Sequence, residues 1–268
     1  AFPASPTRHG AVSLCVSLAG GMGESVDALR TALERAPRSV DIRTATAVEA
    51  LEPDAHGWVA RLSDGPSVPA EAVILAAPAP AAARLLDPIV PAAAAALRTI
   101  PIGSTVAVSL GFREEQLPGP PRGHGFLVPP GEGLAISACT WSSAKWPGRA
   151  PDGFVLVRAF LKAPDAALLA AADETLVAIA RTDLERSMGV RGEPALARVD
   201  RWPDAMPRYT VGHLDRVRAA ETALAATSGI LLAGASYRGV GLPDCIAQGR
   251  AAAGRVLRWL GEQPPSRG

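Results

Sequence analysis

The sequence predicts a mixed α/β fold in which two sheets are flanked by helices. Two segments carry most of this prediction, one near each end of the chain. "LAGGMGESVDALRTALER", which begins at Leu18, passes from an apolar segment through glycines into a helix-like pattern. "LLAGASYRGVGLPDCIAQGR", residues 231–250, runs from an apolar strand through three glycines and a proline into another helix. Strand–glycine–helix units of this kind are typical of nucleotide-binding α/β domains.

The first hundred residues read as the later part of such a sheet. Alternating apolar residues predict a strand over residues 12–18, and a helical spacing follows from Met22 to Leu33. A second strand is expected within residues 39–51, and then a hairpin that turns at Asp64. Residues 72–77 are continuously apolar, which predicts a strand buried on both faces.

The middle of the chain has a different pattern, and we expect a sheet-plus-helix domain there. Strand-like segments separated by Gly/Pro loops occupy residues 105–112, 124–128, 134–139, 154–161 and 195–202. An amphipathic helix is expected over residues 175–188. The chain then returns through a helix over residues 213–226, a strand over 230–233 and a terminal helix. The predicted division is residues 1–100 and 210–268 in one domain and 101–209 in the other.

Bulk composition excludes several classes of function. A net charge of +1 with balanced cations and anions supplies no basic surface for nucleic acid. A hydrophobic content of 48% supports a sizeable core, and no apolar run reaches the length of a membrane span. The cysteines and histidines are isolated, which fits a reducing cytoplasm and argues against a disulfide framework or a metal site. The first ten residues lack the pattern of a secretory signal peptide.

The glycine turn after residue 233 can face a ligand. Gly234 allows close approach of the backbone, and Pro243 suits the first turn of a helix. The free N–H groups at that helix N-terminus can stabilise negative charge on a phosphate, a carboxylate or an electron-rich ring. Alternatively, the turn packs the strand against the helix and binds nothing.

Several segments together resemble one flavoenzyme family. "LAGASYRGVGLPDCIAQGR" resembles the C-terminal flavin motif of the protoporphyrinogen/coproporphyrinogen oxidases, which are amine-oxidase-type flavoenzymes. "LAGGMGESVDAL", "GFLVPPGEGL" and "RWPDAMPRYTVGHL" agree with that family in order and spacing. "ACTWSSAKWP" resembles the Gram-positive branch, which oxidises coproporphyrinogen III. The resemblance covers nearly all of the chain after about residue 10.

The resemblance implies FAD as cofactor, and it also exposes an absence. The family's FAD-binding domain is Rossmann-like and opens with a strand followed by GxGxxG, which holds the pyrophosphate on a helix N-terminus. This sequence contains no GxGxxG. We therefore expect the C-terminal part of a FAD-binding domain together with a substrate-binding domain. We also expect the isolated chain to be inactive and to retain negligible flavin.

Six cofactor-binding residues follow from the resemblance: Val48, Trp202, Gly234, Val240, Gly241 and Leu242. Val48, at the end of the second strand, is expected to contact the adenine end of FAD through its backbone. Trp202 is expected beside the flavin, and Gly234 near the pyrophosphate or ribityl chain. The other three would face the ribityl chain and the pyrimidine side of the isoalloxazine, where a helix N-terminus stabilises reduced flavin. Val48 and Trp202 can alternatively be core residues.

The substrate residues implied by the resemblance or by patterning are His124, Gly125, Leu127, Arg158 and Lys145. The first three lie in "HGFLV", which matches the pocket strand of the family; a small Gly125 would let a flat macrocycle lie close. Arg158 shares one face of its strand with apolar residues, so we expect it to pair with a substrate propionate. Alternatively, it pairs with a neighbouring carboxylate or the opposite face is the buried one. Lys145 is a second propionate candidate, or a solvated lysine.

The implied reaction is the oxidation of coproporphyrinogen III in haem biosynthesis, with molecular oxygen as acceptor. FAD carries the chemistry in this family, so no catalytic side chain is assigned. Loose membrane-surface association is compatible with the family, and the sequence does not indicate an oligomeric state. Protoporphyrinogen IX as substrate, another amine-oxidase-type or carotenoid-desaturase-type flavoenzyme, and an inactive remnant or a half that needs a separate FAD-binding chain remain as alternatives.

Overall fold

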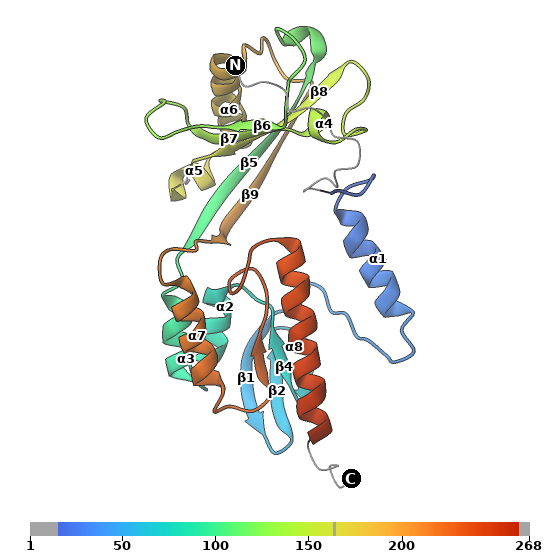
Figure 1. The fold of residues 1–268 in the computed structure, drawn as a ribbon, viewed down its shortest axis with the longest axis vertical. Coiled ribbons are helices and arrows are strands. Elements are labelled where there is room, and N and C mark those ends of the chain that lie inside the picture. The colour runs from blue at the N-terminus through green and yellow to red at the C-terminus, as the bar shows by residue number, and fades with distance from the viewer. Residues whose placement is uncertain (1–15, 163–164, 263–268) are drawn as a thin grey trace, which may run out of the picture.

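Two packed bodies joined by a pair of long strands make up the structure, a computed structural model that describes residues 16–162 and 165–262 (Figure 1). The connecting strands are β5 (Ile102–Arg113) and β9 (Leu196–Pro207), which pair antiparallel. They run from the body that contains α8 (Leu242–Glu262) to the body that contains α6 (Asp173–Met188). The mixed α/β class predicted from sequence is confirmed.

The first body combines two small sheets with helices. An antiparallel sheet has the order β1–β2–β3, and β4 pairs in parallel with β10. Their bounds are β1 Val48–Asp54, β2 Gly57–Leu62, β3 Val68–Ala70, β4 Val73–Leu75 and β10 Ile230–Leu232. In addition to α8, this body contains three helices: α2 Ala79–Leu86, α3 Pro91–Arg98 and α7 His213–Leu224.

The core of this body lies between the helices and the sheets. Leu86 and Leu97, from the alanine-rich helices α2 and α3, are fully buried with Val217 of α7 and Ile230 of β10. Both α2 and α3 have a proline in their first turn, where a missing N–H costs nothing. Their alanines let the helix backbones approach closely, so the contacts between α2, α3 and α7 are dense.

The second body is one antiparallel sheet with the strand order β6–β7–β8–β5–β9. The strands introduced here are β6 Gly125–Leu127, β7 Ile136–Trp141 and β8 Phe154–Leu161, and the short helices are η1 Glu114–Gln116, α4 Ser142–Lys145 and α5 Ala166–Ala170. Helix α6 packs on one face and buries Leu176, Ala180 and Leu184 against β5, β7 and β8. Gly189, in the left-handed conformation, ends α6.

Helix α1 (Gly23–Glu34) stands apart from the described parts of both bodies, and none of its residues is buried (Figure 1). Its predicted apolar stripe is therefore exposed: Val26 has 67% of its surface accessible and Leu29 has 61%. The helix itself matches the sequence expectation.

Three of the strands expected from sequence need correction. The segment expected as a strand over residues 12–18 is irregular at residues 16–18, and the rest of it lies outside the described residues. The second strand begins only at Val48, because residues 39–47 are irregular. Within residues 72–77 only β4 is strand, and it is not buried on both faces, because Ile74 is 38% exposed.

Candidate functional site

The glycine loop, residues 234–241, lies where two parallel strands end together. β4 and β10 align residue for residue, from Val73 opposite Ile230 to Leu75 opposite Leu232. The loop follows β10 and leads directly into α8, which begins at Leu242. In open α/β sheets, ligands bind at the carboxyl ends of parallel strands, and this loop occupies that position.

Two glycines of this loop have conformations that other residues avoid. Gly234 has φ +120°, and a Cβ there would lie 3.4 Å from the Ala76 carbonyl oxygen. Gly239 has φ +132°, and a Cβ there would meet the Asp244 carboxyl at 2.5 Å. The first glycine brings the loop close to the end of β4, and the second brings it close to the first turn of α8.

The loop presents apolar side chains outward beside a helix N-terminus. Val240 is 55% exposed and Leu242 is 57% exposed. The Pro243 position in the first turn of α8 is as expected from sequence. Exposed apolar groups next to free N–H groups fit a ligand that is flat, apolar and electron-rich, and the isoalloxazine of a flavin has this character.

Val48 lines a cavity that reaches the end of β4. This cavity, of about 690 Å³, includes Ala76 in its lining, and the Ala76 carbonyl approaches Gly234. Val48 is 42% exposed and does not belong to the core of the described residues. It also begins β1, in contrast to the strand end expected from sequence.

Trp202 lies on β9, opposite Thr105 of β5. It is 55% exposed and does not belong to the core of the described residues. Tyr209 follows β9 by two residues, and its hydroxyl donates to the Ala235 carbonyl at 2.7 Å. This hydrogen bond joins the end of β9 to the glycine loop.

The three residues of the "HGFLV" segment lie at the edge strand β6. His124 is exposed and its carbonyl accepts from the Trp141 N–H at 3.1 Å, while Leu127 is 82% exposed. Gly125 has φ +142°, and a Cβ there would lie 2.1 Å from the Cys139 carbonyl oxygen. The close approach of β7 therefore explains why a glycine is needed at position 125, independently of any role in binding the substrate.

Arg158 lies on the open face of the second sheet. The odd-numbered residues of β8 from Val155 to Leu161 are buried against α6. Arg158 points to the other face of the sheet and is exposed. Its Nε donates to the Ser109 hydroxyl at 3.1 Å. The strand register places Gly125, Thr140, Arg158 and Ser109 in one row across four strands. The premise of a cation on a buried face was wrong; an accessible cation on an open sheet face is what the structure offers.

Lys145 is half-buried at the end of α4, and its Nζ lies 5.2 Å from the ring centroid of Trp146. This cation–π contact holds the lysine against its own neighbour. Helix α4 packs against β8, which carries Arg158, but no hydrogen bond in the described residues joins the side chains of Lys145 and Arg158.

Tyr209 and His213 hold the glycine loop, but they were not among the site residues predicted from the sequence. Their rings stack with centroids 3.7 Å apart at an interplanar angle of 15°. His213 is only 5% exposed, and burial raises the pKa of Tyr209 above its ordinary range. The signal was present in "MPRYTVGHL", where the two residues stand four apart, but their contact depends on the turn at Gly212, which has φ +81°.

Residues 6–257 match the flavin-containing amine oxidoreductase family. The chain belongs to this family. It is 39% identical over 252 residues to coproporphyrinogen III oxidase of Propionibacterium freudenreichii, covering 94% of this chain and 46% of that protein. It is 36% identical over 230 residues to coproporphyrinogen III oxidase of Bacillus subtilis, covering 85% and 48%. A crystal structure of an Exiguobacterium protein assigned to the protoporphyrinogen oxidases superposes with a TM-score of 0.78 at 33% identity, covering 92% and 52%.

These similarities confirm the family recognised from sequence and FAD as its cofactor. The chain spans about half the length of the curated relatives it matches. The residues present fit one side of a flavin site, because an exposed apolar loop, a glycine that approaches β4 and a helix N-terminus lie together.

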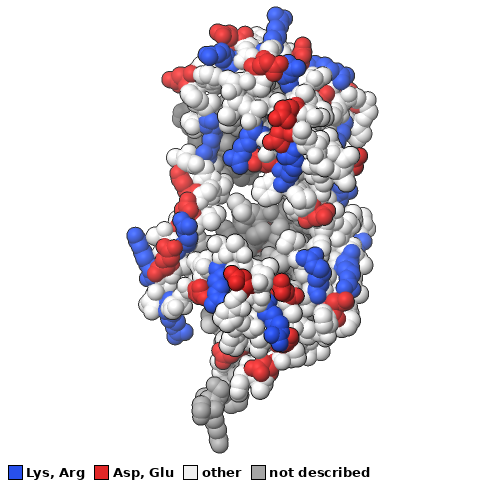
Figure 2. Space-filling view, turned by 180° about the vertical axis from the view of Figure 1, so that it is seen from behind, with Lys and Arg blue, Asp and Glu red and all other residues white. Residues whose placement is uncertain are grey.

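The described residues contain no helix that is long and apolar enough to cross a membrane. Within the same residues, no group of three His, Cys, Asp or Glu side chains is arranged to hold a metal ion. Basic and acidic side chains are interspersed over the face shown in Figure 2, so this face forms no surface of one sign that would attract a polyanion.

Proposed function

We propose that this chain carries the substrate-binding part and one flavin-contacting loop of a coproporphyrinogen III oxidase of haem biosynthesis. The observation that carries the proposal is similarity, over nearly the whole chain, to proteins of that name. Bound FAD would accept electron pairs and pass them to molecular oxygen, so that six electrons and the accompanying hydrogens leave the porphyrinogen as it becomes coproporphyrin III.

The chain's own residues would bind and orient the two reactants. Val240, Gly241 and Leu242 would face the flavin ring, with the N-terminus of α8 behind them, and Gly234 would give the cofactor close access to the backbone. Val48 would contact the adenine end and Trp202 would lie beside the flavin. The open face of the second sheet, within residues 101–209, would receive the macrocycle.

Arg158 would bind a propionate of the substrate through its guanidinium. Its Nε donates a hydrogen bond to the Ser109 hydroxyl. The terminal N–H groups of this exposed side chain remain able to donate to a carboxylate. His124, Gly125 and Leu127, at the edge strand β6, which β7 separates from β8, would pack on the ring system, and Lys145 would meet a second propionate.

The experiment combines this chain with the part of the Propionibacterium freudenreichii relative that it does not match, and measures porphyrin fluorescence with coproporphyrinogen III and protoporphyrinogen IX side by side. We expect oxygen-dependent turnover with a preference for coproporphyrinogen III. Faster turnover of protoporphyrinogen IX would support the second candidate function, which the likeness to the Exiguobacterium structure favours. No turnover of either would contradict an oxidase and favour an inactive remnant.

The Arg158→Ala variant of the same assembly tests the propionate contact. We expect the KM for coproporphyrinogen III to rise about tenfold, the size of one lost charge-assisted hydrogen bond. Arg61→Ala is the matched control, because Arg61 pairs with Glu52 on the remote β1–β2 hairpin. An unchanged KM for Arg158→Ala would remove Arg158 from the substrate site.

A cytoplasmic location belongs to the proposal, on the ground of the isolated thiols in the sequence. Loose association with a membrane surface is compatible with it. Fractionation of cells that express the whole protein would test both, since a salt-resistant membrane fraction is the result that contradicts a cytoplasmic enzyme.

A further inference from the structure

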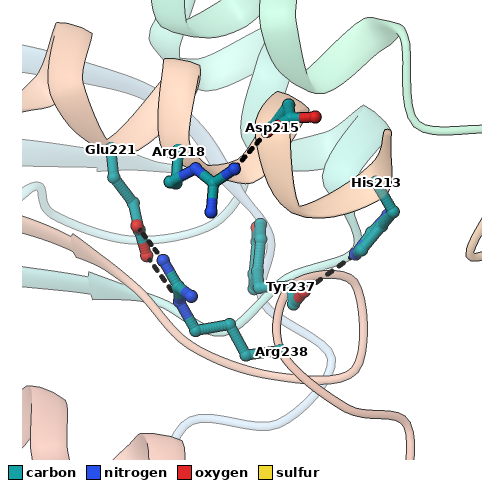
Figure 3. A network of polar contacts seen from close by, with 6 residues as sticks. All are labelled: His213, Asp215, Arg218, Glu221, Tyr237 and Arg238. Carbon is teal, nitrogen blue, oxygen red and sulfur yellow. Dashed lines mark hydrogen bonds and ion pairs between the residues drawn. The ribbon is translucent and has the colours of Figure 1, made fainter. Parts of the chain in front are cut away.

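The glycine loop is held from outside by side chains of the segment that begins α7. His213 Nε2 lies 2.8 Å from the Tyr237 carbonyl oxygen, in a buried contact (Figure 3). Glu221 of α7 accepts from Arg238 through both carboxylate oxygens, and this contact raises the pKa of Arg238. The loop is thus fixed to α7 at two successive residues.

Tyr209 adds two contacts through one hydroxyl group. This group donates to the Ala235 carbonyl at 2.7 Å and accepts from the Gly239 N–H at 2.8 Å. It therefore ties together two loop residues that stand four apart. With the His213 contact, alternate backbone units at residues 235, 237 and 239 are all held by the stacked pair of rings.

The loop needs such an external anchor because of its glycines. Gly239 has no side chain that could anchor the loop. A larger residue does not fit there, because φ is +132° and the Asp244 side chain lies too close. The backbone N–H of Gly239 finds its acceptor in Tyr209, not in regular secondary structure. The next residues, Val240 to Leu242, are those proposed to face the flavin.

We propose that Tyr209 and His213 are positioning residues. They fix the backbone of the glycine loop in the conformation in which Val240–Leu242 face the flavin ring. The flavin part of this inference rests on the proposed function. The anchoring part concerns this chain alone and is tested separately.

The anchoring test measures amide hydrogen exchange in the 268-residue chain by NMR. Tyr209→Phe keeps the ring that stacks on His213 and removes only the hydroxyl. We expect the Gly239 amide to exchange about tenfold faster, because its acceptor is lost. Tyr237→Phe is the matched control: it removes a hydroxyl that donates to the Ala77 carbonyl at 3.1 Å, and it leaves Gly239 exchange unchanged. A Gly239 amide that exchanges at the wild-type rate in Tyr209→Phe would overturn the anchor.

The positioning test titrates FAD into the assembly with the unmatched part of the Propionibacterium freudenreichii relative. We expect Tyr209→Phe to raise the Kd for FAD about tenfold, and to leave the KM for the porphyrinogen at saturating FAD unchanged. Faster Gly239 exchange with an unaltered Kd for FAD would overturn the positioning role. A wild-type assembly that binds no flavin would instead contradict the proposed function, and the exchange result would still decide the anchor.

Discussion

Single side chains in this protein act mainly through the backbone groups that they satisfy. His213 illustrates this, since its Nε2 contacts the Tyr237 carbonyl while Nδ1 has no partner among the described residues. A carbonyl oxygen can only accept, so Nε2 carries a proton in this contact and donates it to Tyr237. The functional consequence is a loop whose position depends on one imidazole N–H.

Replacing His213 tests this role at the residue scale. His213→Leu leaves the buried Tyr237 carbonyl unpaired, so we expect the free energy of unfolding to fall by about 2 kcal/mol. His213→Gln keeps a donor near the Nε2 position and should lose less than half of that. Urea denaturation measures both variants, and equal losses for Leu and Gln would show that packing, not the hydrogen bond, is what His213 provides.

The Cys139 thiol gives a pH dependence of defined sign. Burial raises its pKa from 9.0 to about 12. A folded-state pKa above the unfolded value means that the folded chain holds the proton more tightly. The stabilisation is therefore complete below pH 9 and is lost as the pH rises from 9 toward 12.

We accordingly expect the free energy of unfolding to fall as the pH is raised above about 9. The pH slope should be smaller in Cys139→Ala than in the wild type, because the variant lacks the titrating group. Denaturation curves at pH values on both sides of 9 measure this. Identical slopes in the two proteins would assign the effect to other groups, such as Tyr237, whose pKa burial also raises.

At the scale of elements, α6 is attached to the second sheet by a buried carboxylate. Asp183 is 5% exposed, and its Oδ2 accepts from the N–H groups of Ala135 at 2.6 Å and Ile136 at 2.9 Å. The helix thereby satisfies the two N–H groups at the start of β7. Helical periodicity marks apolar positions only, so the sequence pattern identified Leu176 and Leu184 but not the acid beside them.

Asp183→Ala should lower the free energy of unfolding by about 2–4 kcal/mol, because two buried N–H groups lose their acceptor. Asp183→Asn keeps one oxygen in place and should cost clearly less. Thermal and urea unfolding of the two variants provide the measurement. A loss below about 0.5 kcal/mol for Ala would mean that water replaces the carboxylate.

The sequence predicted elements better where the pattern is local than where it depends on neighbours. The strand Phe154–Leu161 was predicted with the bounds observed, α6 and α7 were predicted within a few residues, and the terminal helix α8 was expected without stated bounds. Helices α2 and α3 were missed because each is only eight residues long and has a proline in its first turn, which reads as a break in the pattern. The face of Arg158 was misjudged because alternation shows that two faces differ but not which one the helix covers.

At the scale of the whole molecule, apolar side chains remain exposed on several elements. Val26 and Leu29 on α1 and Ile246 and Leu257 on α8 each have more than 60% of their surface accessible. The family model matches these helices, while the chain spans about half of its relatives' length. In the proposed function, the part of the relatives that this chain does not match would cover these surfaces.

The sequence could place the glycine loop, Gly234 and the helix N-terminus of the candidate site, because all three are local. It could not place Tyr209 against His213, nor Val48 and Ala76 in the lining of one cavity, because these arrangements bring together segments that are distant or separated by a turn. The sequence contains no GxGxxG, the segment expected to hold the FAD pyrophosphate in this family.

The most direct test is the visible flavin absorbance of the purified 268-residue chain, alone and after co-expression with the unmatched part of the Propionibacterium freudenreichii relative. We predict negligible flavin on the chain alone, since no residue stretch in it supplies the GxGxxG pyrophosphate site. We predict equimolar flavin in the co-purified complex. Equimolar flavin on the chain alone, or a stable complex without flavin, would contradict a flavin site divided between the two parts.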